Sequence, residues 1–129
     1  MTRREARVAA MQIIYNNMFY ATSLEESLSF FDYEDKEKVL SFLKLVEGKI
    51  AQIDTIISAC LENYTIDRLN QVDKAILRLA TADLLAGTPK GVVINEALEI
   101  TREYSDQGDN KAVRFNNKLL DKIVNKLEL

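Results

Sequence analysis

The sequence predicts an all-α protein: one compact domain of about six or seven helices spanning residues 1–129. Glycine occurs four times and proline once, too rarely for the many turns of a β-sandwich or barrel. Apolar residues recur at helical spacing in several long segments, and no segment alternates with the period of a strand. No repeat of fixed period is present. We therefore expect short connections between packed helices.

The first expected helix runs from Thr2 to about Tyr20, a segment without glycine or proline. Thr2 is suited to cap its amino end, because a threonine hydroxyl can accept a free backbone N–H there. Glu5, Gln12 and Asn16 fall on one narrow stripe, and most of the remaining surface is apolar. A helix that is apolar over so much of its circumference usually lies at the centre of a bundle. We therefore predict a buried opening helix.

Two further helices and a break are expected before residue 62. Ser23 is suited to cap a short second helix, with Glu26 completing a capping box three residues later. The third helix carries the apolar residues Val39, Phe42, Leu43 and Val46. Gly48 marks a break or a close helix crossing. The apolar pattern then resumes from Ile50 to Leu61.

Three more helices are expected in the second half of the chain, separated by short polar connections. Residues 63–71 are polar and less regular, and Gly87-Thr88-Pro89 and the loop Ser105–Asn110 separate the later helices. The expected helical spans are Val72–Leu85, about Val92–Ile100 and about Lys111–Lys126.

The composition argues against catalytic chemistry. Cys60 is the only cysteine and histidine is absent, so an internal disulfide, a Cys/His zinc site and histidine-based dyads are excluded. Cys60 lies in an apolar pattern that predicts a buried, inert thiol. The four glycines are scattered, so no phosphate-binding glycine loop exists. The acidic pairs Glu96/Glu99 and Glu99/Glu103 indicate a solvated helix face more readily than a metal site. We expect no enzyme activity, no cofactor and no metal.

The sequence predicts a cytoplasmic protein that does not enter a membrane. The amino-terminal segment lacks the charged and apolar regions of a secretion signal. No apolar run approaches the ~20 residues that are needed to span a bilayer.

The positive charge gathers at the amino-terminal tip of a chain whose net charge is −3. Residues 23–73 carry eleven acidic against five basic side chains. Arg3, Arg4 and Arg7 are spaced by three or four residues, so their guanidinium groups can converge on one side of a helix start. That end of a helix is already electropositive, and arginine matches phosphate in a bidentate manner. The cluster indicates either an RNA-binding site or merely a solvated basic terminus.

Four stretches, in order, resemble the transcription antitermination factor NusB family. The first has Arg3, Arg4 and Arg7 in an Arg-x-x-Ala-Arg pattern, followed by Gln12, Ile13, Ile14 and Tyr15. The others are Arg68-Leu69-x-x-Val72-Asp73-Lys74-Ala75-Ile76-Leu77-Arg78, Val92-Val93-Ile94-Asn95-Glu96-Ala97-Leu98 leading to Tyr104-Ser105, and Phe115-x-Asn117-x-x-Leu120-Asp121-Lys122. Together they span nearly the whole chain.

The resemblance implies two small helical bundles packed together and an RNA-binding function. Family members bind single-stranded boxA RNA together with the ribosomal protein NusE, and act in the RNA polymerase antitermination complex, notably on ribosomal RNA operons. Some members self-associate through the RNA-binding face, so a homodimer is possible. The RNA-contacting residues that the resemblance implies are Arg3, Arg4, Arg7, Gln12, Tyr15, Tyr104, Phe115 and Asn117. It also implies that Asp67 and Asp73 contact the protein partner.

These residue types suit the implied roles. Cations hold the backbone of single-stranded RNA, and aromatic faces stack on its bases. Carboxylates complement a basic ribosomal protein. Each assignment has a structural alternative: Tyr15 and Phe115 suit core packing equally well. Asp67 and Asp73 suit capping of the helix around Val72.

Two other functions compete with this interpretation. A helical scaffold that binds proteins without RNA affinity is favoured by the net acidity, and by Lys118 at a position where the family usually has glycine. A role in ribosomal RNA modification would require an attached methyltransferase domain, which the 129 residues do not contain.

Overall fold

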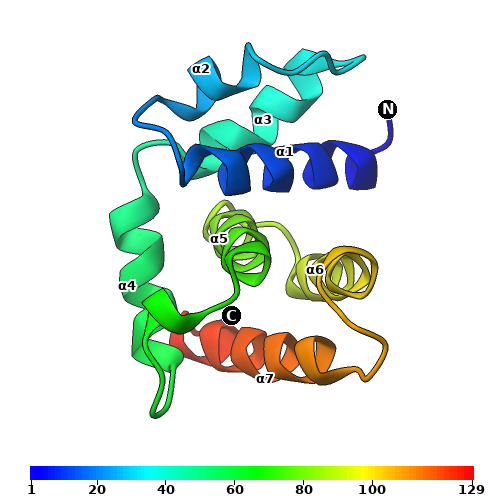
Figure 1. The fold of residues 1–129 in the computed structure, drawn as a ribbon. Coiled ribbons are helices and arrows are strands. Elements are labelled where there is room, and N and C mark those ends of the chain that lie inside the picture. Colours follow the sequence, from blue (N-terminus) through cyan, green and yellow to red (C-terminus); the bar gives the residue numbers. More distant parts are fainter.

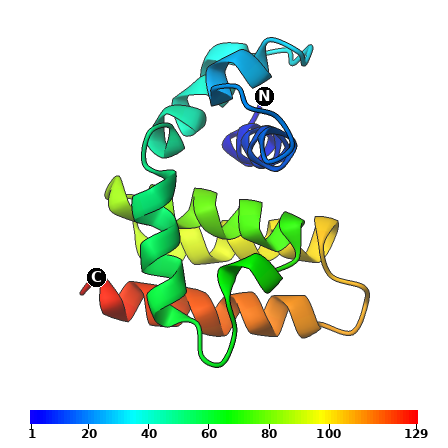
Figure 2. The same ribbon diagram turned by 60° about the vertical axis from the view of Figure 1, so that its left-hand side comes forward.

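The computed structural model describes all residues, 1–129, and contains helices without any strand, which confirms the predicted fold class. The elements are α1 (Arg3–Asn17), α2 (Leu24–Leu28), α3 (Lys36–Val46), α4 (Ile50–Cys60), the short 3-10 helix η1 (Ile66–Arg68), α5 (Gln71–Leu85), α6 (Lys90–Tyr104) and α7 (Lys111–Lys126). Figures 1 and 2 show two packed groups, with α1 to α3 above and α4 to α7 below. This arrangement matches the two small bundles that the resemblance implied.

Helix α5, and not the opening helix, lies at the centre of the molecule. It contacts α1, α3, α4, α6 and α7, and eleven of its fifteen residues are buried. Helix α1 buries seven of fifteen residues, all on one side. The prediction of a buried opening helix is therefore right for one face and wrong for its central position. Small side chains on α5, such as Ala75, Ala80 and Ala82, let neighbouring helices approach from several directions.

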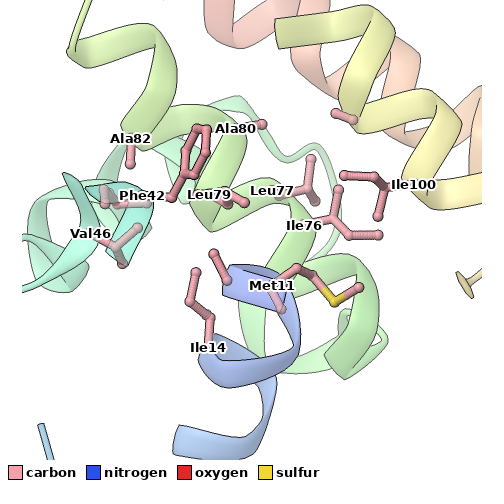
Figure 3. Packing of buried hydrophobic residues seen from close by; sticks show 14 of the residues in the cluster. Met11, Ile14, Phe42, Val46, Ile76, Leu77, Leu79, Ala80, Ala82 and Ile100 are labelled. Atoms are coloured by element: carbon pink, nitrogen blue, oxygen red, sulfur yellow. The ribbon is translucent and has the colours of Figure 1, made fainter. Parts of the chain in front are cut away.

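A single hydrophobic core joins the two groups of helices. Thirty buried residues form one contiguous cluster. Figure 3 shows side chains of α1, α3 and α6 meeting those of α5. The labelled examples are Met11 and Ile14 of α1, Phe42 and Val46 of α3, Ile76, Leu77 and Leu79 of α5, and Ile100 of α6. Each fully buried large side chain stabilises the fold by about 1.5–3 kcal/mol. The core therefore fixes α1 and α6, which carry most of the predicted site, relative to each other.

Helix α1 ends at Asn17, three residues before the predicted end. The backbone N–H groups of Phe19 and Tyr20 donate to carbonyls only three residues earlier, which tightens the last turn. The side chain of Asn17 donates to the carbonyl of Thr22 at 2.7 Å and to Ser27 Oγ at 3.1 Å. These bonds turn the chain back towards α2.

The amino end of α2 is capped differently from the prediction. Ser23 Oγ accepts the N–H of Glu26 at 3.0 Å, as expected. The reciprocal half of the predicted capping box is not formed. Instead Glu47, at the end of α3, accepts the N–H of Leu24 at 2.9 Å. A tertiary bond thus replaces the local one and ties α2 to α3.

Cys60 at the end of α4 is buried, as predicted, and burial raises the pKa of its thiol. A raised pKa leaves little thiolate at neutral pH, so the side chain is a poor nucleophile. No helix has both the length and the apolar character that crossing a membrane requires.

Candidate RNA and protein interfaces

The start of α1 is held in place by a complete capping box. Thr2 Oγ1 accepts the N–H of Glu5 at 3.0 Å, and Glu5 Oε1 accepts the N–H of Thr2 at 2.7 Å. The backbone N–H of Thr2 lowers the pKa of the Glu5 carboxyl. This confirms Thr2 as the cap and fixes the direction in which the arginines of the first two turns leave the helix.

Arg7 is buried, which corrects the expectation that it lies exposed beside Arg3 and Arg4. Its Nε donates to Asp83 Oδ2 on α5 at 3.0 Å, and its Nη1 lies 3.8 Å from Glu96 Oε1 on α6. The guanidinium carbon lies 4.8 Å from the centre of the Phe42 ring. Two carboxylates and an aromatic face thus already surround this cation, so the direct phosphate contact predicted for Arg7 lacks the exposed group it needs.

Arg4 also forms an ion pair with Glu96, whereas Arg3 does not contact this carboxylate. Arg4 Nε donates to Glu96 Oε2 at 2.6 Å, while nearly half of the Arg4 side chain stays exposed. Arg3 is exposed. Together with Arg7, Lys38 and Thr88, it lines a surface depression that does not include Arg4. Contrary to the prediction, the three arginines therefore do not all converge on one side of the helix start: Arg7 shares a carboxylate with Arg4 and a depression with Arg3. Arg4 and Arg7 converge on Glu96 because this side chain reaches from α6 to the first turns of α1.

A pocket beside α1 brings together three of the predicted RNA-contacting residues. Arg4 and Gln12 of α1 and Tyr104 of α6 line a space of about 330 Å³. Figures 1 and 2 place the first turns of α1 between α6 and the connection that precedes α3. Tyr33 of that connection also lines the pocket, and its hydroxyl donates to Gln12 Oε1 at 3.0 Å. The pocket thus combines an exposed cation, an amide and two phenol rings.

The other predicted RNA contacts lie away from this pocket. Tyr15 is partly exposed on α1 and packs edge-on against Phe19, with ring centres 5.4 Å apart. Phe115 is exposed on α7 and packs against Tyr64 instead, with ring centres 5.9 Å apart. Asn117 is exposed on α7. Neither Tyr15 nor Phe115 is a core residue, so the packing alternative is wrong for both.

The two aspartates predicted to contact a protein partner differ in exposure. Asp67 is exposed on η1. Asp73 is buried, and its Oδ1 accepts bonds from Ser105 Oγ at 2.6 Å and Asn116 Nδ2 at 3.1 Å. Asn70 caps α5 in its place, accepting the N–H of Val72 at 2.8 Å. Asp73 therefore joins α5, α6 and α7, which corrects its predicted position on an exposed interface.

Three residues that shape the site were not identified as functional from the sequence: Tyr33, Asp83 and Glu96. Tyr33 lies in a stretch whose pattern indicates only a connection. Asp83 and Glu96 lie 76 and 92 residues from the arginines they bind, Arg7 and Arg4. No local spacing signals such partners. Covariation between positions in an alignment is the signal that could have found them.

Comparison with known proteins decides the family. The model of the NusB family matches residues 4–125. The chain belongs to the NusB family. A transcription antitermination protein NusB from Clostridium botulinum is 40% identical over 98% of this chain and 100% of its own length. One from Listeria innocua is 36% identical over 96% of this chain and 97% of its own length.

Solved structures agree with this assignment. NusB from T. maritima superposes with a TM-score of 0.82 at 31% identity, covering 100% of this chain and 99% of that one. A crystal structure of the antitermination factors NusB and NusE in complex with double-stranded RNA superposes with a TM-score of 0.78. Its matching chain is 26% identical, with 96% of both chains covered. NusB-family membership therefore rests on sequence and fold together.

Proposed function

We propose that this chain is a transcription antitermination factor without enzymatic activity. It binds single-stranded boxA RNA together with the ribosomal protein NusE and acts in the RNA polymerase antitermination complex, notably on ribosomal RNA operons. Its place of action is the cytoplasm, where RNA is transcribed in bacteria. Membership of the NusB family supports this proposal, and the relative solved with NusE and double-stranded RNA supports NusE and an RNA as partners.

The pocket between α1 and α6 is the observation that carries the RNA assignment. Arg4 offers a partly exposed guanidinium, Gln12 an amide, and Tyr104 a ring that is 40% exposed. Single-stranded RNA is held by this combination of cations and stacking surfaces. Tyr15 continues the same face along α1, since it lies three residues after Gln12. Arg3 adds positive charge at the helix start.

Phe115 and Asn117 would extend the RNA-binding surface beyond the 105–110 connection. Tyr104 and Phe115 line different pockets, and the 105–110 connection lines the pocket of Phe115. An RNA that contacts both rings would therefore run along this connection. Arg7 supports the site indirectly: its bonds to α5 and α6 hold α1 in place. Asp67 is the exposed carboxylate available to the basic partner. Asp73 accepts a bond from Ser105 and so holds the start of the 105–110 connection in place.

A salt titration of RNA binding tests the proposal. We would measure fluorescence anisotropy of a labelled boxA RNA with and without NusE. Affinity should fall with salt, and Arg4→Ala should reduce the log–log slope by roughly 0.7, the value for one single-strand phosphate contact. Lys126→Ala, at the far end of α7, should leave the slope unchanged. Absence of RNA binding under all conditions, with NusE binding intact, would favour the protein scaffold instead.

A further inference from the structure

Gln12 lines the pocket between α1 and α6, and its amide is hydrogen-bonded to Tyr33. A glutamine side chain carries one acceptor oxygen and one donor NH₂ group, and either can be presented by a flip of the amide. The Tyr33 hydroxyl donates to Gln12 Oε1 at 3.0 Å. This bond engages the oxygen and leaves the Nε2 donor as the group that Gln12 can offer to an occupant.

Tyr33 is itself held in position. Its ring stacks on Phe31 with 5.6 Å between ring centres and 12° between the planes. Burial, and to a smaller extent nearby Tyr104, raise the pKa of the Tyr33 phenol, so the hydroxyl stays protonated and able to donate. The connection between α2 and α3 thus presents an aromatic residue, stacked on Phe31, to the polar stripe of α1.

The residues that line the pocket suit a neutral group with an aromatic face. Its volume of about 330 Å³ lies at the small end of ligand sites. Tyr104, from α6, adds a second phenol ring to its lining, and Val8 and Ala9 are apolar. The carboxylates of Glu5 and Glu103 also line it, which disfavours a phosphate inside. Arg4, at the same site, can hold the backbone phosphate of a nucleotide whose base enters.

We infer that this pocket receives one nucleobase of the bound RNA, and that Tyr33 determines which base is accepted by fixing the Gln12 amide with its donor outward. The inference rests on the proposed RNA-binding function and adds a specificity mechanism to it. The selected base presents a carbonyl or ring-nitrogen acceptor to Gln12 Nε2. Tyr33 acts as a positioning residue and Gln12 makes the contact.

A series of boxA oligomers, each with one nucleotide made abasic, tests the pocket. We expect one position at which the abasic change weakens binding about 5- to 150-fold, the range for loss of one stacked base. Base substitutions at that position should then be ranked by their acceptor pattern. Equal tolerance of abasic changes at every position would overturn the inference.

The variant Tyr33→Phe tests the positioning role, because it keeps the ring and removes the donor to Gln12. Discrimination between bases at the sensitive position should fall about 2- to 10-fold, the effect of one net hydrogen bond. The salt slope should stay unchanged. Tyr20→Phe is the matched control, since Tyr20 is exposed in the turn after α1 and outside the pocket.

A double-mutant cycle with Gln12→Leu separates positioning from direct contact. If Tyr33 acts through Gln12, Tyr33→Phe should have no further effect in the Gln12→Leu protein. A full effect of Tyr33→Phe in that background would show that Tyr33 touches the RNA itself, and would overturn the positioning role. If wild-type protein binds no boxA RNA at all, the proposed function fails and the inference fails with it. Salt-dependent binding without base discrimination would reject the inference alone.

Discussion

Asp83 on α5 holds the guanidinium of Arg7 inside the protein, with 3.0 Å between Oδ2 and Nε. The side chains of both residues are more than nine-tenths buried, and Asp83 also accepts a bond from Thr88 Oγ1 at 2.9 Å. The pair therefore anchors the basic start of α1 to the central helix and to the connection before α6. Its function is structural, although the spacing of the arginines pointed to RNA.

Arg7→Ala should destabilise the fold strongly. Removing one partner of a buried ion pair leaves the other charge uncompensated, which costs about 3–5 kcal/mol. Urea denaturation followed by circular dichroism measures this. Arg3→Ala is the matched control and should fall within ~0.5 kcal/mol, because Arg3 is exposed. The double variant Arg7→Met with Asp83→Leu should recover part of the loss. Equal stability of the two alanine variants would refute the anchoring role.

Glu96→Gln should strengthen RNA binding. Glu96 engages Arg4 at 2.6 Å, so a phosphate has to compete with this carboxylate for the guanidinium. Neutralising it should raise the affinity, because the phosphate no longer has to displace a carboxylate, while the salt slope should stay near that of the wild type, since Arg4 still makes one single-strand contact. Anisotropy titrations at several salt concentrations measure both quantities. Glu99→Gln is the control, because Glu99 pairs with Arg102 and not with Arg4. An affinity equal to that of the wild type would show that Glu96 does not compete.

Asp67→Lys should weaken binding to NusE and leave the fold intact. A charge reversed at the rim of an interface acts mainly by slowing association, and we expect at least a several-fold loss. Stability should change by no more than ~0.5 kcal/mol, since Asp67 is exposed. Association rates can be followed by biolayer interferometry. An unaltered association rate would place the partner elsewhere.

Asp73→Ala, in contrast to Asp67→Lys, should lower the stability of the fold. Its loss leaves the Asn116 amide and the Ser105 hydroxyl without their acceptor, which costs about 1–3 kcal/mol. Any loss of NusE affinity should then be accompanied by a lower free energy of unfolding, measured in urea. Weaker NusE binding with full stability would restore Asp73 as a direct contact.

The fold could be predicted from the sequence because helical periodicity and caps are local signals. The last helix spans Lys111–Lys126 as expected, and Thr2 caps the first. The choice of central helix was missed because α1 and α5 are both largely apolar. What separates them is the number of neighbours that each acquires in the packed chain, a tertiary property.

The site was predicted only in part, for a related physical reason. Spacing places Arg4 and Arg7 on one face of α1, but it cannot reveal that Glu96 of α6 reaches that face. Residues Asn116 and Asn117 show the same limit on α7: one is fully buried and bonded to Asp73, and its neighbour is exposed. Successive helical residues differ by about 100° in direction. The packing of α7 therefore decides which of the two adjacent asparagines is exposed.

The stability contributed by the capping box of α1 should depend on pH. Accepting the Thr2 N–H lowers the pKa of Glu5 in the folded protein below the ordinary glutamate value of about 4.3. A group whose pKa is lower when folded adds stability above its unfolded pKa. That contribution is lost as the pH falls through the folded pKa. The difference in free energy of unfolding between the wild type and Glu5→Gln should thus be constant near neutral pH and should shrink below about pH 4.

Thr2→Val separates the two halves of this capping box. It removes the hydroxyl that accepts the Glu5 N–H, but it keeps the backbone N–H that donates to Glu5 Oε1. The variant should lose about 1 kcal/mol near neutral pH, because that acceptor is lost. Its stability should retain only part of the acid dependence that Glu5→Gln abolishes, because the Thr2 backbone N–H lowers the pKa of Glu5 most and the Thr2 hydroxyl lowers it further. Urea denaturation of all three proteins between about pH 7 and about pH 3 covers the window in which glutamate titrates. If Glu5→Gln follows the wild type in parallel down to the lowest pH, the Glu5 carboxylate does not stabilise the helix start through its charge.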